Sequence, residues 1–396
     1  MQLACDILVI GDGAVGKTAA LGLAQAGLDV IVLRPGAARP ATSPEEWDVR
    51  VYALNRVAHD LLAALKVWPA LDTSRIAEVD SMIVYGDGPA AGNLVFDAYG
   101  ARSTELAWIV EDRNLNVALD AALRFSPNLR SVSGNATRLE VDASHAAVTL
   151  DNGDVLRATL VVGADGANSW VRGQCDIDLD YRSYGQRAIV SNFACEHPHH
   201  GAAYQWFSAS EGIIALLPLA GQRVSLVWSA PEALATSLLE GSLTQLARRL
   251  CALPGHRLGR LTPLQPEAVK SFPLSLQRPH QIVAPRVALI GDAAHVVHPL
   301  AGHGMNLGFA DVNELIRRIG EREAHRDCGD ERVLARYARA RKEDIFLMQA
   351  ATDGLERLFS TDFEPVRIAR NLGLNLVNKF PVLKRALISH ALGRRS

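Results

Sequence analysis

Residues 5–16 read CDILVIGDGAVG, and an Ala/Leu-rich stretch follows them and ends at Gly27. The apolar run at 5–10 is typical of a strand buried in a parallel sheet. The glycines of this stretch then open a helix, and residues 29–33 form the next apolar run. The order strand, glycine turn, helix and strand predicts a βαβ unit of a Rossmann-like domain.

The three glycines fit the pattern G-x-G-x-x-G of dinucleotide-binding turns. Gly11 would allow the tight turn, Gly13 would let a pyrophosphate approach the backbone, and Gly16 would let helix and strand pack closely. The free N–H groups of the helix N-terminus would bind the anion. A structural turn without a ligand is the alternative. Arg34 stands where an acidic residue usually bonds the adenosine ribose, which indicates either a 2′-phosphate or a ribose held by other groups.

Composition narrows the class of protein. Of 396 residues, 48% are hydrophobic and 21% charged, with a formal net charge of −2. These values exclude a disordered chain and argue against a nucleic-acid-binding protein. The five cysteines are scattered and include no C-x-x-C pair, so we expect no disulfide framework, no zinc site and a reducing compartment. Without a signal peptide or an apolar stretch of about 18 residues, we expect a cytoplasmic protein.

The pattern of apolar runs and turns changes along the chain. Short apolar runs separated by turns between residues 186 and 230 predict an antiparallel sheet, and a buried-strand pattern returns at 286–292. We therefore predict an α/β fold in which a sheet-rich domain interrupts the dinucleotide domain. The predicted boundaries are 1–78, 107–175 and 281–335 for the dinucleotide domain, 79–106 and 176–280 for the substrate domain, and 336–396 for a C-terminal helical region.

Residues 291–308, GDAAHVVHPLAGHGMNLG, resemble the signature of flavin-dependent aromatic hydroxylases of the para-hydroxybenzoate hydroxylase type. They are most similar to the ubiquinone-biosynthesis branch, the 2-polyprenylphenol hydroxylases. Residues 163–169, GADGANS, resemble the second motif of the family, and 11–16 resemble the first. The run 382–387 also resembles the C-terminal end of that branch. The resemblance thus covers nearly the whole chain.

This resemblance implies an FAD site and NAD(P)H as the electron donor. A helix N-terminus beside the isoalloxazine ring would stabilise the negative charge of the reduced flavin. The implied cofactor-binding residues are Gly11, Gly13 and Gly16 at the pyrophosphate, Arg50 and Arg113, Asp165 near the pyrophosphate, Asp292 at the ribityl or pyrophosphate portion, and Pro299, Gly302, Gly304, Met305 and Asn306 around the ring.

The implied reaction is hydroxylation of the ring of a polyprenylated phenol or quinol by molecular oxygen, through a flavin hydroperoxide. The family commonly has Gln where this chain has His303, so His303 is either a catalytic group or a tolerated substitution. His298 is another candidate base. The alternatives are the hydroxylation of another small aromatic molecule, a flavin-dependent reductase, and a non-catalytic FAD-binding subunit of a ubiquinone-synthesis complex.

Three further patterns carry weaker signals. Tyr204, Trp206, Phe207 and Trp228 are expected to form one wall of the substrate cavity or part of the core. The histidines of segment 197–200 favour a solvated turn over a metal site. After Glu364 the chain has no acidic residue and alternates basic with apolar side chains. That tail predicts a basic amphipathic helix, either packed on the protein or bound peripherally to the inner membrane beside other ubiquinone-synthesis proteins.

Overall fold

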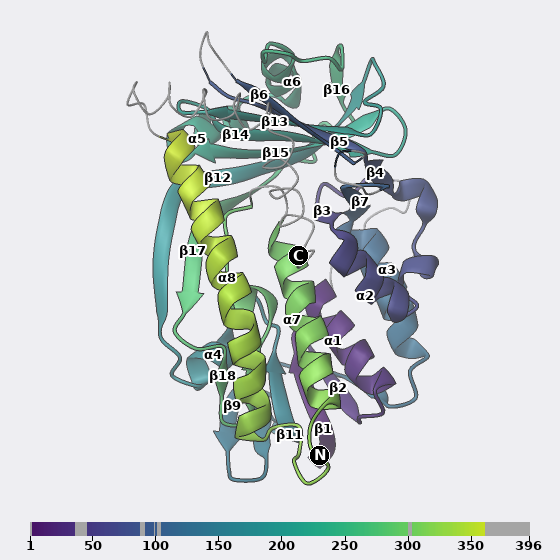
Figure 1. The fold of residues 1–396 in the computed structure, drawn as a ribbon, viewed down its shortest axis with the longest axis vertical. Coiled ribbons are helices and arrows are strands. Elements are labelled where there is room, and N and C mark those ends of the chain that lie inside the picture. Colours follow the sequence, from purple (N-terminus) through teal and green to yellow (C-terminus); the bar gives the residue numbers. More distant parts are fainter. Residues whose placement is uncertain are drawn as a thin grey trace.

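The computed structural model describes residues 2–35, 46–87, 92–98, 100, 104–299 and 303–360. Within these residues the strands form two large sheets and a small third one. The long axis of the molecule runs from one large sheet to the other (Figure 1). The predicted α/β fold, with a Rossmann-like part interrupted by a sheet-rich part, is confirmed.

The first large sheet contains the βαβ unit. Its strands are β1 (Gln2–Ile10), β2 (Val30–Arg34), β8 (Leu129–Ser133), β9 (Ala136–Val141), β10 (Ala146–Leu150), β11 (Val155–Gly163), β18 (Val283–Ala284) and β19 (Val287–Leu289). β1 pairs in parallel with β2 and β11, and the order is β18-β19-β11-β1-β2-β8. The antiparallel strands β10 and β9 continue from β11.

Helices cover one face of this sheet. They are α1 (Ala14–Gln25), α2 (Arg56–Ala64), α3 (Asp112–Arg124) and α7 (His303–Gly320). Because side chains alternate across a strand, Ile7 and Val9 of β1 pack in the core on this face. Leu8 and Ile10 pack in a second core on the opposite face. Both faces of β1 are therefore buried, as its continuous apolar run predicts.

The second large sheet is mostly antiparallel. Its strands are β5 (Ser81–Tyr85), β6 (Asn93–Asp97), β12 (Leu179–Cys195), β13 (Ala202–Ser208), β14 (Gly212–Leu219), β15 (Arg223–Pro231), β16 (Leu261–Pro263) and β17 (Lys270–Pro279). They follow the order β16-β12-β15-β14-β13-β5-β6, and β17 pairs with β12. The helices α5 (Glu232–Glu240) and α6 (Leu243–Cys251) pack on its outer face.

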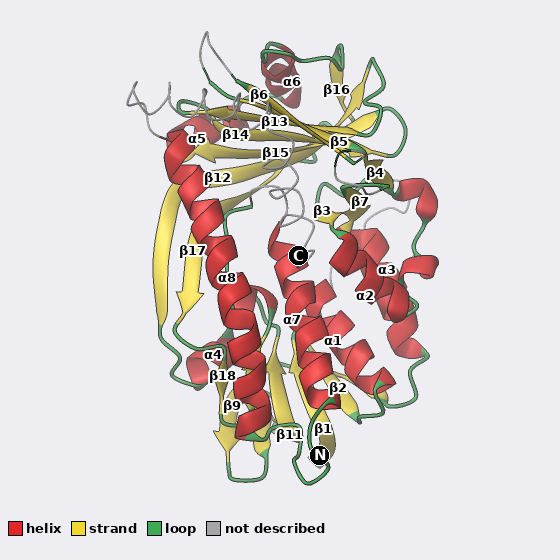
Figure 2. Cartoon of the chain, in the orientation of Figure 1, coloured by secondary structure: helices red, strands yellow, loops and turns green. Residues whose placement is uncertain are grey.

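A small sheet and a long helix join the two large sheets (Figure 2). The small sheet contains β3 (Val51–Leu54), β4 (Ala77–Val79) and β7 (Ala107–Glu111), and it shares a core with β14. Helix α8 (Glu331–Ser360) runs along the long axis. The shorter helices are η1 (Trp68–Ala70), η2 (Thr73–Arg75), α4 (Trp170–Gln174) and η3 (Gly291–Ala293).

In the described part of the chain, no helix is long and apolar enough to cross a membrane. The tail at 361–396, with its predicted amphipathic helix, lies outside the described residues.

Candidate functional site

The turn between β1 and α1 packs tightly against neighbouring backbone. Gly11 has a φ of +120°, and a Cβ there would overlap the carbonyl oxygen of Ala164. A Cβ on Gly16 would overlap the carbonyl oxygen of Gly11. Contacts within the protein therefore require glycine at both of these positions.

Gly13 differs from its two neighbours in the motif. Among the described residues, a Cβ on Gly13 would meet no atom within 4 Å, and the φ of −71° at Gly13 suits any residue. Gly13 is the N-cap of α1 and offers no side-chain acceptor to the first N–H groups of the helix. Free N–H groups beside open space form an anion site, so this turn fits the diphosphate of a dinucleotide.

Residues 11–18 also match G-x-x-x-x-G-K-[ST], the pattern of mononucleotide phosphate loops. In those loops the Lys amine must reach a phosphate. Lys17 is only 2% exposed, and its Nζ donates to Asn116 Oδ1 at 3.0 Å and to Asp120 Oδ2 at 2.9 Å. The Thr18 hydroxyl donates back to its own helix. These contacts disfavour a phosphate loop and leave the dinucleotide interpretation.

The second motif follows β11 and lies against the glycine turn. The backbone nitrogen of Asp165 lies 3.0 Å from the place of a Cβ on Gly11. The Asp165 carboxylate accepts from the Ser169 hydroxyl at 2.6 Å and from the backbone N–H of Val171 at 3.0 Å. Its side chain therefore stabilises the start of α4, and its contact with the cofactor remains a prediction.

The third motif reaches the same turn. Val15 of α1 lies beside both Gly291 and Gly308, since a Cβ on Gly291 would be 3.3 Å from the Val15 side chain and one on Gly308 would be 2.9 Å from it. Three motifs that are far apart in the sequence thus meet around the start of α1.

Two residues of opposite charge lie next to this meeting point. Asp292 keeps part of its surface open to solvent, but many protein atoms surround its carboxyl. The resulting desolvation raises the pKa of this carboxyl, and the positive charges of His295 and Arg50 act in the opposite direction. Arg50 is also exposed, and its guanidinium carbon lies 5.5 Å from the centroid of the Tyr52 ring. The Tyr52 hydroxyl donates to Asp112 Oδ1 at 2.5 Å. Two opposite charges, one of them partly desolvated, fit the polar portion of a bound dinucleotide.

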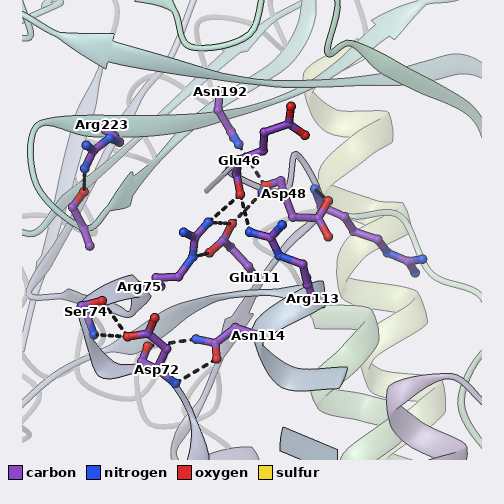
Figure 3. A network of polar contacts seen from close by, with 12 residues as sticks. Glu46, Asp48, Asp72, Ser74, Arg75, Glu111, Arg113, Asn114, Asn192 and Arg223 are labelled. Atoms are coloured by element: carbon purple, nitrogen blue, oxygen red, sulfur yellow. Dashed lines mark hydrogen bonds and ion pairs between the residues drawn. The ribbon is translucent and has the colours of Figure 1, made fainter. Parts of the chain in front are cut away.

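The segment that leads to Arg50 is held by a buried acid (Figure 3). Glu111 is 0% exposed, and its carboxylate accepts two hydrogen bonds from Arg75 at 2.6 and 2.9 Å. The same carboxylate accepts the backbone N–H of Asp48 at 2.6 Å. From the second large sheet, Asn192 donates to the carbonyl of Asp48 at 2.9 Å. Both β7 and β12 therefore fix the position of this segment.

Cation–π contacts add to this arrangement. The Trp47 ring contacts two guanidinium groups, with its centroid 4.3 Å from the guanidinium carbon of Arg75 and 5.1 Å from that of Arg223. Arg113, a predicted cofactor ligand, donates to the carbonyl of Glu46. The residues that hold this segment could not be predicted from the sequence because none belongs to a recognisable motif.

The predicted ring-binding loop is described in part. Pro299 is half-buried, Gly302 lies outside the described residues, and so does the side chain of His303, the first residue of α7. A catalytic role of His303 therefore stays a prediction. Gly304 and Met305 are half-buried.

Asn306 anchors the start of α7. Its side-chain amide donates to the carbonyl of Ala53 at 2.8 Å, and its oxygen accepts the backbone N–H of Asn55 at 2.9 Å. The side chain of Asn306 is thus used within the protein, and its contact with a flavin stays a prediction.

His298, the other candidate base, is fully buried. Its Nε2 lies 3.1 Å from Gln186 Oε1, and Gln186 Nε2 donates to Glu356 Oε1 at 3.0 Å. Because an amide oxygen only accepts, His298 carries its proton on Nε2. Burial lowers the pKa of His298 to about 4. A neutral, fully enclosed imidazole is poorly placed to take a proton from a substrate, so this geometry favours a positioning role.

The low pKa of His298 predicts a pH dependence of stability. The folded-state pKa of about 4 lies below the ordinary value of 6.5, so the unfolded chain binds the proton first as the pH falls. We expect this residue to reduce the free energy of unfolding by about 3 kcal/mol between pH 7 and pH 4. The measurement is chemical denaturation across this range for the wild type and His298→Gln. Subtracting the two curves removes the carboxyl contributions, including that of Glu356, whose raised pKa acts in the opposite direction. Parallel curves would contradict the assignment.

A buried ionic network supports the third motif from behind. Asp311 is 0% exposed and accepts from His295 Nε2 at 2.6 Å, from Arg341 Nε at 2.7 Å and from the backbone N–H of Gly291 at 2.9 Å. It links α7 and α8 to the turn that carries Asp292.

The four aromatic residues considered for the substrate cavity or the core lie in hydrophobic cores. Tyr204, Trp206 and Trp228 belong to the core between the second large sheet and the helices α5 and α6. Phe207 lies on the opposite face and packs against Phe359, with a centroid separation of 4.1 Å. Of the two alternatives, part of the core is therefore confirmed for the first three residues, because alternation along the strands places them on the outer, helix-covered face.

No metal centre emerges from the described residues, which contain no group of three or more His, Cys, Asp or Glu placed to bind one. In the predicted turn, His199 Nε2 lies 2.8 Å from the backbone carbonyls of Leu219 and Gly221.

Comparisons with known proteins agree with this geometry. The family described as FAD binding domain matches residues 4–348. The chain is 35% identical over 390 residues to the 3-demethoxyubiquinol 3-hydroxylase of Escherichia coli (strain K12), covering 98% of both chains. It is 36% identical over 394 residues to ubiquinone hydroxylase UbiL of Rhodospirillum rubrum, covering 98% of this chain and 89% of the relative.

Solved structures share the fold. The p-nitrophenol 4-monooxygenase PnpA of Pseudomonas putida superposes with a TM-score of 0.79 at 18% identity, covering 100% of both chains. HpxO of Klebsiella pneumoniae, solved with FAD and uric acid, gives 0.75 at 18% identity and covers 99% of this chain and 96% of that one. With the family match and the glycine turn, these findings identify the chain as a member of the FAD-binding aromatic hydroxylases that include the ubiquinone hydroxylases.

Proposed function

We propose that this FAD-dependent monooxygenase hydroxylates the aromatic ring of a polyprenylated phenol or quinol intermediate of ubiquinone biosynthesis, with molecular oxygen and with NAD(P)H as the electron donor. The observation that carries the proposal is the meeting of all three motifs around the start of α1. Similarity to two ubiquinone hydroxylases over nearly the whole chain supports the choice of substrate.

Each part of the site has a role in the proposal. The free N–H groups at Gly13 hold the FAD diphosphate, and Asp292 with Arg50 contacts the polar portion of the cofactor. Arg113, Asp165, Pro299 and the backbone at 302–306 complete the site. Bound FAD supplies the oxygen activation, while the protein orients the ring and excludes water.

The proposed substrate domain comprises 79–106 and 176–280, and the remaining described residues bind FAD or support that site. We further propose that the basic and apolar tail at 361–396 associates with an anionic membrane surface, where a polyprenylated substrate and other ubiquinone-synthesis proteins would be found.

One assay tests these proposals together. The purified flavoprotein is mixed with NAD(P)H and anionic lipid vesicles that carry a prenylated demethoxyquinol. We expect oxygen uptake, a product with one added oxygen atom and co-sedimentation with the vesicles. Deletion of the tail should abolish co-sedimentation and leave the flavin bound. Reduction of the substrate without oxygen uptake would indicate a reductase instead. Turnover of only non-prenylated phenols would contradict the proposed prenylated substrate and indicate another small aromatic molecule.

A further inference from the structure

The carboxyl end of β2 carries a cation where dinucleotide-binding sheets usually carry an acid. The backbone N–H of Gly11 donates to the carbonyl of Leu33 at 3.2 Å, so Arg34 follows directly beside the glycine turn. The adenosine ribose of a dinucleotide binds at this strand end, and its hydroxyls donate to an acidic side chain. A guanidinium has no acceptor, so Arg34 cannot take that role.

An acid from another helix lies next to this cation. Asp120 of α3 places Oδ1 3.0 Å from Arg34 Nη2 and Oδ2 2.9 Å from Lys17 Nζ. Lys17 also donates to Asn116 at 3.0 Å, and Lys17 is almost fully buried. The Asp120 side chain keeps 34% of its surface exposed. Two cations from β2 and α1 thus orient one carboxylate that remains open to a ligand.

The hydrogen-bonding capacity of this carboxylate is not exhausted. Each oxygen of an ionised Asp can accept about two hydrogen bonds, and within the described residues each Asp120 oxygen has one ion-pair partner. A 2′-phosphate beside Arg34 would lie against the negative charge of Asp120. The same position therefore suits ribose hydroxyls better than a phosphorylated ribose.

We propose that Asp120 is the acceptor for the ribose hydroxyls in the adenosine half of FAD. In this chain the acidic ligand comes from α3 instead of from the end of β2, and Lys17 and Arg34 are the positioning residues that hold it. The inference rests on FAD as the cofactor and does not depend on the substrate that is hydroxylated.

The test combines protein variants with cofactor variants. The apoprotein is titrated with FAD and with an FAD analogue that lacks the 2′ and 3′ hydroxyls of the adenosine ribose, and binding is followed by flavin fluorescence. We expect the wild type to bind the analogue about tenfold to a hundredfold more weakly than FAD. In Lys17→Met/Asp120→Ala, which removes the buried cation together with its partner, FAD and the analogue should bind equally.

Two controls separate a ribose contact from general damage. Asp29→Asn breaks the ion pair with Arg130 near the opposite end of β2, at 2.7 Å, and should keep the full discrimination against the analogue. FMN, which lacks adenosine, should bind the double variant and the wild type alike. Equal wild-type affinities for FAD and the analogue, or discrimination that persists in the double variant, would overturn the proposal. Because the readout is cofactor affinity, a failed hydroxylation assay leaves this test unaffected.

Discussion

The variant Gly13→Val is expected to fold normally and to bind FAD at least about a hundredfold more weakly than the wild type. In the part of the chain that the structure describes, no atom lies within 4 Å of the added Cβ, and the extended backbone of this N-cap accepts a branched residue. The side chain would instead fill the space beside the free N–H groups of α1, where the diphosphate must approach. The measurement is FAD titration of the apoprotein, together with its thermal unfolding midpoint.

Two glycines serve as comparisons. Gly173→Val adds a side chain at a position that is also open within 4 Å but lies in α4, and it should retain FAD affinity. Gly16→Val should reduce the folded population itself, since its Cβ would overlap the carbonyl of Gly11. Tight FAD binding by Gly13→Val would show that the diphosphate lies elsewhere.

Asp311→Ala is expected to lower the free energy of unfolding by about 3–5 kcal/mol, the usual cost of leaving buried charges unpaired. Burial alone would raise the pKa of Asp311, but His295 and Arg341 outweigh burial and lower it. The carboxylate is therefore ionised and stabilising above its unfolded pKa, and its contribution is lost as the pH falls through the lower folded value. Removing the Asp311 carboxylate takes this ion pair away from Arg341, whose side chain is only 4% exposed.

Chemical denaturation at neutral pH measures this loss. The matched control is Asp180→Ala, which breaks another His–Asp pair, His280–Asp180 at 3.2 Å, whose side chains are 55% and 69% exposed. Water already solvates that pair, so its removal should leave stability nearly unchanged. If the two variants lost equally little stability, the buried network would not support the third motif as inferred.

Much of the fold and the identity of the cofactor could be predicted from the sequence. The apolar run of β1, the glycine pattern and the start of α1 are encoded within a single local stretch. Backbone geometry then decides the outcome, because a φ of +120° at Gly11 and the close approach at Gly16 require glycine whatever surrounds them. Periodicity within a segment likewise distinguished the parallel sheet from the antiparallel one.

The ion-pair partners of charged groups could not be predicted from local sequence patterns. Lys17 and Asp120 are 103 residues apart and meet only because α1 packs beside α3. Glu111 and Arg75 hold the segment of Arg50 through contacts that no local pattern encodes. The face on which Trp206 and Trp228 lie was also decided by packing, since strand alternation defines two faces but not which one the helices cover. The sequence by itself determined the βαβ turn and the anion site at the start of its helix, because both follow from backbone geometry. Tertiary structure alone decided which charges and aromatic rings surround that ligand, because these depend on how distant elements pack.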